Sequence, residues 1–152
     1  MTKNAFTTIA AILLILYSLA NFGAGFGHFA KGKMISGTAN IASSMGTWAG
    51  DTHNAQQIKK EGMSAATVFY LIALFIFITA VLNLAAAVGL FSGQPWAVTL
   101  VTVSCIFGVL VEIQDIALGG FGIGKFVFLG INIFAFLVAQ SAKKSAEAPA
   151  IV

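Results

Sequence analysis

The fold of this chain is decided by residues 63–118, which read MSAATVFYLIALFIFITAVLNLAAAVGLFSGQPWAVTLVTVSCIFGVLVEIQDIAL. No charged side chain occurs between Glu61 and Glu112, and segments surrounded by lipid tolerate such a gap easily. The motif SGQP interrupts the apolar residues at 92–95, where a glycine can stop one helix and a proline can open the next. The sequence therefore predicts two antiparallel transmembrane helices, 63–91 and 95–118, joined by a tight turn.

Two further apolar segments flank this pair and predict helices over residues 5–23 and 125–141. Residues 24–62 are rich in Gly, Ser, Thr and Asn and form the only sizeable polar region of the sequence, so they predict a long polar loop between the first two helices. Within it, the spacing of Ile41, Met45 and Trp48 fits a short helix on the membrane interface, and an irregular loop fits equally well. The predicted fold is an all-α integral membrane four-helix bundle, with residues 1–152 forming a single transmembrane domain.

The composition excludes several other classes of protein. Hydrophobic residues make up 59% of the 152 residues and charged residues only 9%, whereas soluble domains carry about 25% charge. The net charge of +3 comes from eight scattered lysines without any arginine, which argues against a nucleic-acid surface. The lysine distribution does not fix the orientation in the membrane. Apolar spans with sparse lysines favour a prokaryotic inner (cytoplasmic) membrane.

The candidate site for a ligand is an acidic pair in the predicted third helix. Glu112 and Asp115 lie three residues apart on one helix face, with Gln114 between them. An ionised carboxylate in hydrocarbon is costly, so the pair must face inward, share a proton or find a cation. Lys125 is the nearest partner in sequence. Two interpretations stay open: a proton, cation or polar-ligand site, or a solvated pair that fixes the helix end at the headgroups.

Three asparagines lie in three different apolar segments: Asn21, Asn83 and Asn132. An asparagine in a membrane helix commonly forms a hydrogen bond across a helix interface. The alternative is a polar core that the three amides share with Glu112, which makes Asn83 a further candidate for the site.

No catalytic motif is present. The sequence has no phosphate-binding loop, nucleophile elbow, C-x-x-C or H-E-x-x-H motif, so we do not predict an enzyme. His28 and His53 do not match the ligand spacing of a zinc site or the placement of haem ligands, and we expect them on a surface loop. No metal and no cofactor is predicted.

The end of the second predicted helix reads AAAVGLFSGQPWA from Ala85 to Ala97. With the length of the chain and the order of its spans, this segment resembles the DoxX-like group of small four-helix bacterial membrane proteins. The resemblance implies a four-helix membrane fold and redox or accessory roles in membrane complexes. It supplies no specific site residue.

Two functional hypotheses follow. The first is a non-enzymatic accessory or structural subunit of a membrane assembly, because packing residues are abundant and catalytic motifs are absent. The second is a small proton- or cation-handling transporter or channel that uses Glu112 and Asp115. The expected partners are the lipid bilayer and either other membrane subunits or further copies of this chain, and no nucleic acid is expected.

Overall fold

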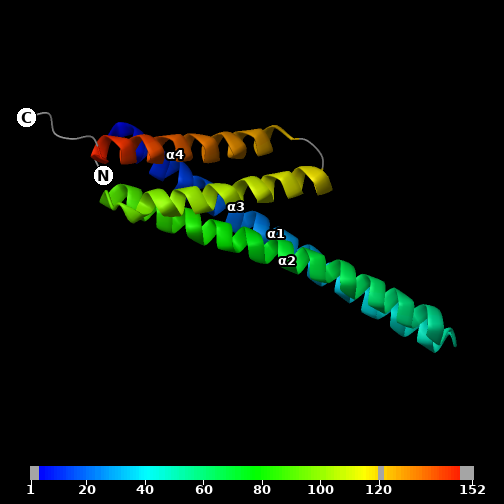
Figure 1. Ribbon diagram of the computed structural model, residues 1–152. Coiled ribbons are helices and arrows are strands. Elements are labelled where there is room, and N and C mark those ends of the chain that lie inside the picture. Colours follow the sequence, from blue (N-terminus) through cyan, green and yellow to red (C-terminus); the bar gives the residue numbers. More distant parts are fainter. Residues whose placement is uncertain (1–3, 120–121, 148–152) are drawn as a thin grey trace, which may run out of the picture. The chain divides into compact units, whose positions relative to one another are not determined.

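Four α-helices account for most of the chain. The computed structural model describes residues 4–119 and 122–147. Its helices are α1 (Ala5–Trp48), α2 (Thr52–Ser92), α3 (Trp96–Gly119) and α4 (Ile123–Glu147), and the described residues contain no strand (Figure 1). Each helix is long and apolar enough to cross a membrane. The all-α class is therefore confirmed, and the four apolar helices indicate an integral membrane protein.

The long polar loop predicted for residues 24–62 is wrong, because most of these residues are helical. The first helix was expected to end at residue 23 and the second to begin at 63, yet only three residues separate α1 from α2. Gly50 has a left-handed backbone with φ of 88°. Its N–H donates to the Thr47 carbonyl at 3.1 Å, and the next N–H donates to the Gly46 carbonyl at 3.0 Å. These paired bonds form a Schellman stop, and α2 starts at once.

A similar stop lies between α2 and α3, as the sequence predicted. Gly93 has φ of 69°, and the N–H of Gln94 donates to the Gly89 carbonyl at 2.9 Å. Here the structure differs from the predicted helix bounds by one residue at most. At the other end of the chain α4 covers residues 123–147, beyond the predicted 125–141, because its last turns continue through polar residues that an apolar pattern does not capture.

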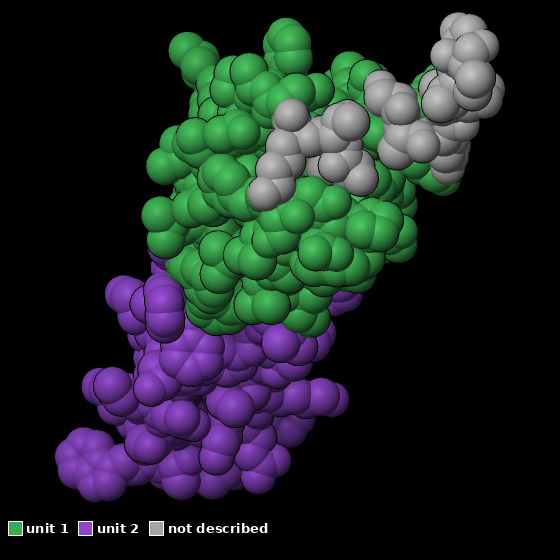
Figure 2. All heavy atoms as spheres, turned by 90° about the vertical axis from the view of Figure 1, so that its left-hand side faces the viewer, with its two compact units in different colours: residues 1–22, 76–152 green, residues 23–75 purple. Residues whose placement is uncertain are grey.

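The chain divides into two compact units, which Figure 2 colours separately. The first unit comprises residues 1–22 and 76–152, and the second comprises residues 23–75. In the second unit the C-terminal half of α1 and the N-terminal half of α2 form an antiparallel hairpin (Figure 1).

A seam of small residues explains why the polar segment folds as a helical hairpin. On α1 the small residues recur every seven positions, and on α2 they recur every four or seven. An added Cβ at Gly62 would collide with the Cβ of Ala39, and one at Gly32 would lie 2.7 Å from the Tyr70 ring. Glycine is a poor helix former, but here it lets two backbones approach closely. The seam consists of Gly25, Gly32, Ala39 and Gly46 on α1 and of Ala55, Gly62, Ala66 and Ala73 on α2.

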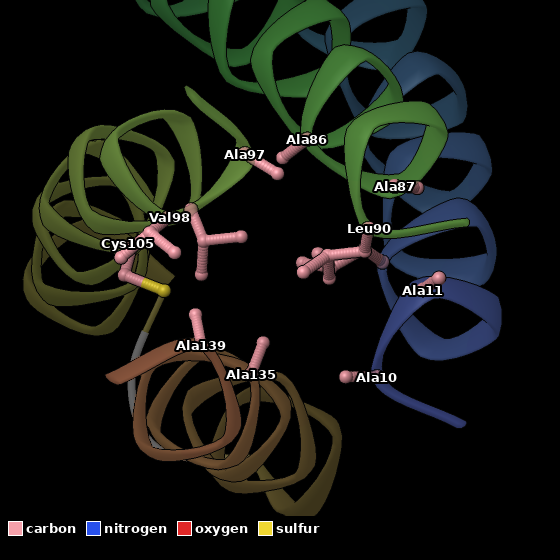
Figure 3. Packing of buried hydrophobic residues seen from close by; sticks show 12 residues of the cluster. Ala10, Ala11, Ala86, Ala87, Leu90, Ala97, Val98, Cys105, Ala135 and Ala139 are labelled. Atoms are coloured by element: carbon pink, nitrogen blue, oxygen red, sulfur yellow. The ribbon is translucent and has the colours of Figure 1, made fainter. Parts of the chain in front are cut away.

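The first unit is built around a core to which all four helices contribute. Figure 3 shows small side chains from each helix directed toward one another. Alanine predominates, so the helices approach closely, as is usual in membrane bundles. The core contains Ala10, Ala11, Leu14, Ala86, Ala87, Leu90, Ala97, Val98, Val101, Cys105, Ala135 and Ala139.

Candidate functional site

A buried carboxyl group lies within the first unit, among apolar helices. Glu112 on α3 is only 5% exposed, and Tyr17 on α1 is fully buried. The Tyr17 hydroxyl donates a hydrogen bond to Oε1 of Glu112 at 3.1 Å. The Tyr17 ring also lies against Phe128 of α4, with the ring centroids 5.1 Å apart. Side chains from three helices therefore meet at Tyr17.

Helical periodicity turns Glu112 inward. The buried positions on α3 include Ser104, Cys105, Gly108 and Val111, which follow the spacing of three and four residues that defines one helix face. Glu112 lies one turn after Gly108 on that face. The acid is thus held inside the unit by the apolar pattern of its own helix.

Two buried amides lie beside the Tyr17 hydroxyl. Asn21 is 5% exposed and Asn132 is fully buried, and both side chains lie close enough to the hydroxyl to interact with it. Asn132 is tied into α4, because its Nδ2 donates to the Phe128 carbonyl at 3.1 Å. Tyr17, Asn21, Asn132 and Glu112 form a cluster that we call the polar layer.

Gly108 allows α3 to approach Asn132. A Cβ at this position would lie 2.7 Å from both terminal atoms of the Asn132 amide, so any side chain here would displace the amide or the helix. The Cys105 thiol, on the same face of α3, donates to the Asn132 backbone carbonyl at 3.0 Å. These contacts fix α4 against α3 at the level of the polar layer.

Several buried polar atoms have no hydrogen-bond partner among the residues that the structure describes. They are both amide atoms of Asn83, Oδ1 of Asn132 and Nδ2 of Asn21. Asn83 lies on α2 and is fully buried. Buried amides in proteins are usually satisfied, and leaving one without a partner costs about 1–3 kcal/mol. The first unit therefore offers buried donors and acceptors to a small polar ligand.

The structure places the predicted site residues as follows. Glu112 and Asn83 are buried in the first unit. Gln114 is half-buried, and Lys125 is half-buried in the first turn of α4. Asp115 belongs to α3, but its side chain lies outside the described part of the chain. The predicted pairing of Glu112 with Asp115 and Lys125 stays a prediction.

Tyr17 was not among the residues that the sequence singled out. The available signal was its spacing: Tyr17 and Asn21 are four residues apart, so they share a helix face within an otherwise apolar segment. A polar pair on one face of a transmembrane helix points toward the bundle interior. That Tyr17 contacts Glu112, 95 residues away, emerges only from the packing of α1 against α3.

The histidines do not lie on a surface loop, contrary to expectation. His28 is half-buried on α1 beside Phe69, with the ring centroids 6.0 Å apart, and His53 is exposed on α2. Among the described residues, no three His, Cys, Asp or Glu side chains cluster closely enough to hold a metal ion.

The polar layer is made of one carboxyl, one phenol and neutral amides. Such oxygen-rich sets suit protons and hard cations rather than zinc or copper. No family model, curated protein or solved structure matches this chain in the comparisons with known proteins.

Proposed function

We propose that this chain is a small multi-pass membrane protein that binds and passes a proton or a monovalent cation at Glu112. The observation that supports the proposal is the Tyr17–Glu112 hydrogen bond inside a unit formed by four apolar helices. Glu112 is only 5% exposed there.

The energetics of a buried acid favour an ion site. An ionised carboxylate in hydrocarbon is strongly disfavoured, so its charge must be balanced by a proton, a metal cation or a lysine ammonium. The amides of Asn21 and Asn132, which lie beside the Tyr17 hydroxyl, are neutral, and their oxygens can serve as ligands to a cation or to a hydrated proton. Exchange of the balancing ion at Glu112 would be the elementary step of transport.

Flux measurements test the proposal directly. The purified protein is reconstituted into liposomes that contain a pH-sensitive dye, and a potassium diffusion potential is imposed. We expect a flux of protons, either alone or coupled to sodium, and we expect Glu112→Gln to abolish it. Glu61→Gln is the matched control, because Glu61 is an exposed carboxyl on the helical hairpin. Wild-type flux no greater than that of empty liposomes would contradict the proposal.

Chemical labelling identifies the ion that balances Glu112. Dicyclohexylcarbodiimide adds to a protonated carboxyl group: the carboxyl oxygen bonds to the central carbon, and the proton moves to a nitrogen of the reagent. We expect labelling of Glu112 and not of Glu61, detected by mass spectrometry. Protection by sodium at fixed pH would indicate that sodium and a proton compete for the site. If Glu112 is labelled in the Lys125→Met variant but not in the wild type, the lysine ammonium is the charge that balances Glu112.

A second candidate function is an accessory subunit of a membrane assembly in a prokaryotic inner membrane. The supporting observation is α4, where only 17% of the most apolar window is buried within the chain, against 39–44% for the other three helices. Such a face suits either lipid or a partner helix. Purification in a mild detergent tests this function, and recovery of the protein without any second protein would count against it.

A further inference from the structure

The helical hairpin carries a second seam, on the face of α1 that points away from α2. Its positions alternate in steps of four and three residues over 26 residues, which is the a/d spacing of a coiled coil. All are exposed except Gly37, which is half-buried. We call it the outer seam, and it consists of Gly23, Gly27, Ala30, Met34, Gly37, Ile41, Ser44 and Trp48.

The outer seam is distinct from the seam that packs against α2. Gly32 and Ala39 belong to the seam that packs against α2. Met34 follows Gly32 by two positions and Ile41 follows Ala39 by two positions, which is about 200° around a helix. Gly32 and Ala39 are buried, whereas Met34 is 72% and Ile41 is 65% exposed. One helix thus has two helix-packing faces, and the hairpin uses only one of them.

The position of the membrane boundary makes this exposure significant. Around Gly32 the aromatic and lysine side chains gather: the Phe29 and Tyr70 ring centroids lie 5.3 Å apart, and Lys33 Nζ lies 5.5 Å from the Phe29 centroid. Such belts are typical of the membrane–water interface. The hairpin beyond this level carries the charged side chains Asp51, Lys59, Lys60 and Glu61, so its apolar stripe, which ends at Trp48 with 93% exposure, would face water. Large apolar patches in water mark interaction surfaces.

We infer that the outer seam binds the same seam of a second copy of this chain, in parallel. The repeat spans between three and four heptads, which is about the minimum length at which a heptad pattern favours a coiled coil. No charged residue occurs from Met34 to Gly50, so no like charges oppose each other where identical seams meet along this part of the hairpin. Two copies inserted in one bilayer with the same topology have parallel α1 helices, and a two-fold axis along the membrane normal places identical residues opposite each other.

The glycines of the outer seam suit close contact between the two copies. Nothing lies within 4 Å of a Cβ added at Gly23, Gly27 or Gly37, so their absent side chains serve no packing within the chain. Small residues four positions apart, such as Gly23 and Gly27, allow close helix approach in membranes. Met34, Ile41 and Trp48 would then supply the apolar burial beyond the interface. The inference does not depend on the ion site at Glu112.

Disulfide cross-linking of the full-length protein tests the inference. Cysteine is introduced by Ile41→Cys or Trp48→Cys in a Cys105→Ala background, and the protein is oxidised in liposomes. We expect covalent dimers from both variants and none from Asn40→Cys, an exposed position on the same helix outside the seam. An antiparallel pair centred on Ile41 would link through Ile41→Cys but not through Trp48→Cys, and would overturn the parallel arrangement.

The mass of the unmodified wild-type protein gives an independent readout. Sedimentation in detergent is expected to show a concentration-dependent dimer, and Ile41→Lys is expected to raise its dissociation constant by at least about tenfold, because two buried side chains are lost per dimer. Asn40→Lys should leave it unchanged. A wild-type monomer at all concentrations, or a dimer indifferent to Ile41→Lys, would overturn the inference and assign the seam to a different protein or to lipid.

Discussion

The hydrogen bond between Tyr17 and Glu112 can be tested by a double-mutant cycle. Tyr17→Phe removes the hydroxyl and keeps the ring that packs on Phe128. Glu112→Met removes the carboxyl and keeps a side chain of similar length. The cycle compares each single variant with the double variant, so that effects other than the interaction between the two side chains cancel.

The structure sets the expected magnitude. The oxygen–oxygen distance of 3.1 Å is slightly longer than the usual range of about 2.5–3.0 Å for such bonds. We therefore expect a coupling free energy of about 0.5–1.5 kcal/mol if the acid is neutral and about 1.5–3 kcal/mol if it is ionised. Tyr17→Phe alone should be destabilising, because it leaves a buried carboxyl oxygen without its donor. The double variant should be more stable than the sum of the two single changes predicts, because both polar partners are then replaced by apolar groups.

The assay is reversible unfolding in mixed micelles, followed by circular dichroism. The control cycle combines Tyr17→Phe with Thr8→Ala, since Thr8 is exposed and its hydroxyl donates to the carbonyl of Asn4, the residue before α1. Thr8 lies nine residues from Tyr17, about 13.5 Å along the helix. The control should be additive within about 0.5 kcal/mol. A coupling of that size or smaller between Tyr17 and Glu112 would refute the polar layer as an energetic unit and would weaken the proposed ion site.

Three further predictions concern packing. Gly62→Leu should destabilise the protein by about 1–3 kcal/mol, because even a Cβ there collides with Ala39. Gly130→Leu is the control and should not be destabilising, because nothing lies within 4 Å of its Cβ position. Thermal unfolding of both variants tests this prediction. Ser18→Ala should cost about 0.6–1.7 kcal/mol through loss of its 2.7 Å hydrogen bond to the α2 backbone, and an unchanged unfolding midpoint would contradict the contact. Cys105 should react with a maleimide at least tenfold more slowly in the folded protein than in denaturant, because it is only 7% exposed; equal rates would contradict its burial.

The polar hairpin could not be predicted from composition, because its residue types favour turns when considered one at a time. Glycine, serine and asparagine are poor helix formers in isolation. The information lay in spacing: Gly25, Gly32, Ala39 and Gly46 recur every seven residues, and such a repeat matters only when a second helix packs along it. Tertiary contact with Ala55 and Gly62 outweighs the local preference.

The candidate site was predictable in part. An acid within an apolar helix must turn inward or reach water, and that rule applied to Glu112 from the sequence alone. The sequence did not pair it with Tyr17, because a tyrosine in an apolar segment carries no sign of its partner. It also did not distinguish Asn83, whose amide lacks a partner among the described residues, from Asn132, whose amide donates to α4.

The four apolar helices and the tight turn at Gly93 follow from the sequence by itself, since hydrophobic length and a glycine before a proline are local properties of the chain. The continuation of α1 and α2 through the polar segment, and the meeting of Tyr17, Asn21, Asn132 and Glu112, were decided only by the tertiary structure. The physical reason is the same in both cases: close backbone approach and buried hydrogen bonds gain their free energy from residues far apart in the chain, and no local pattern encodes which helices will supply them.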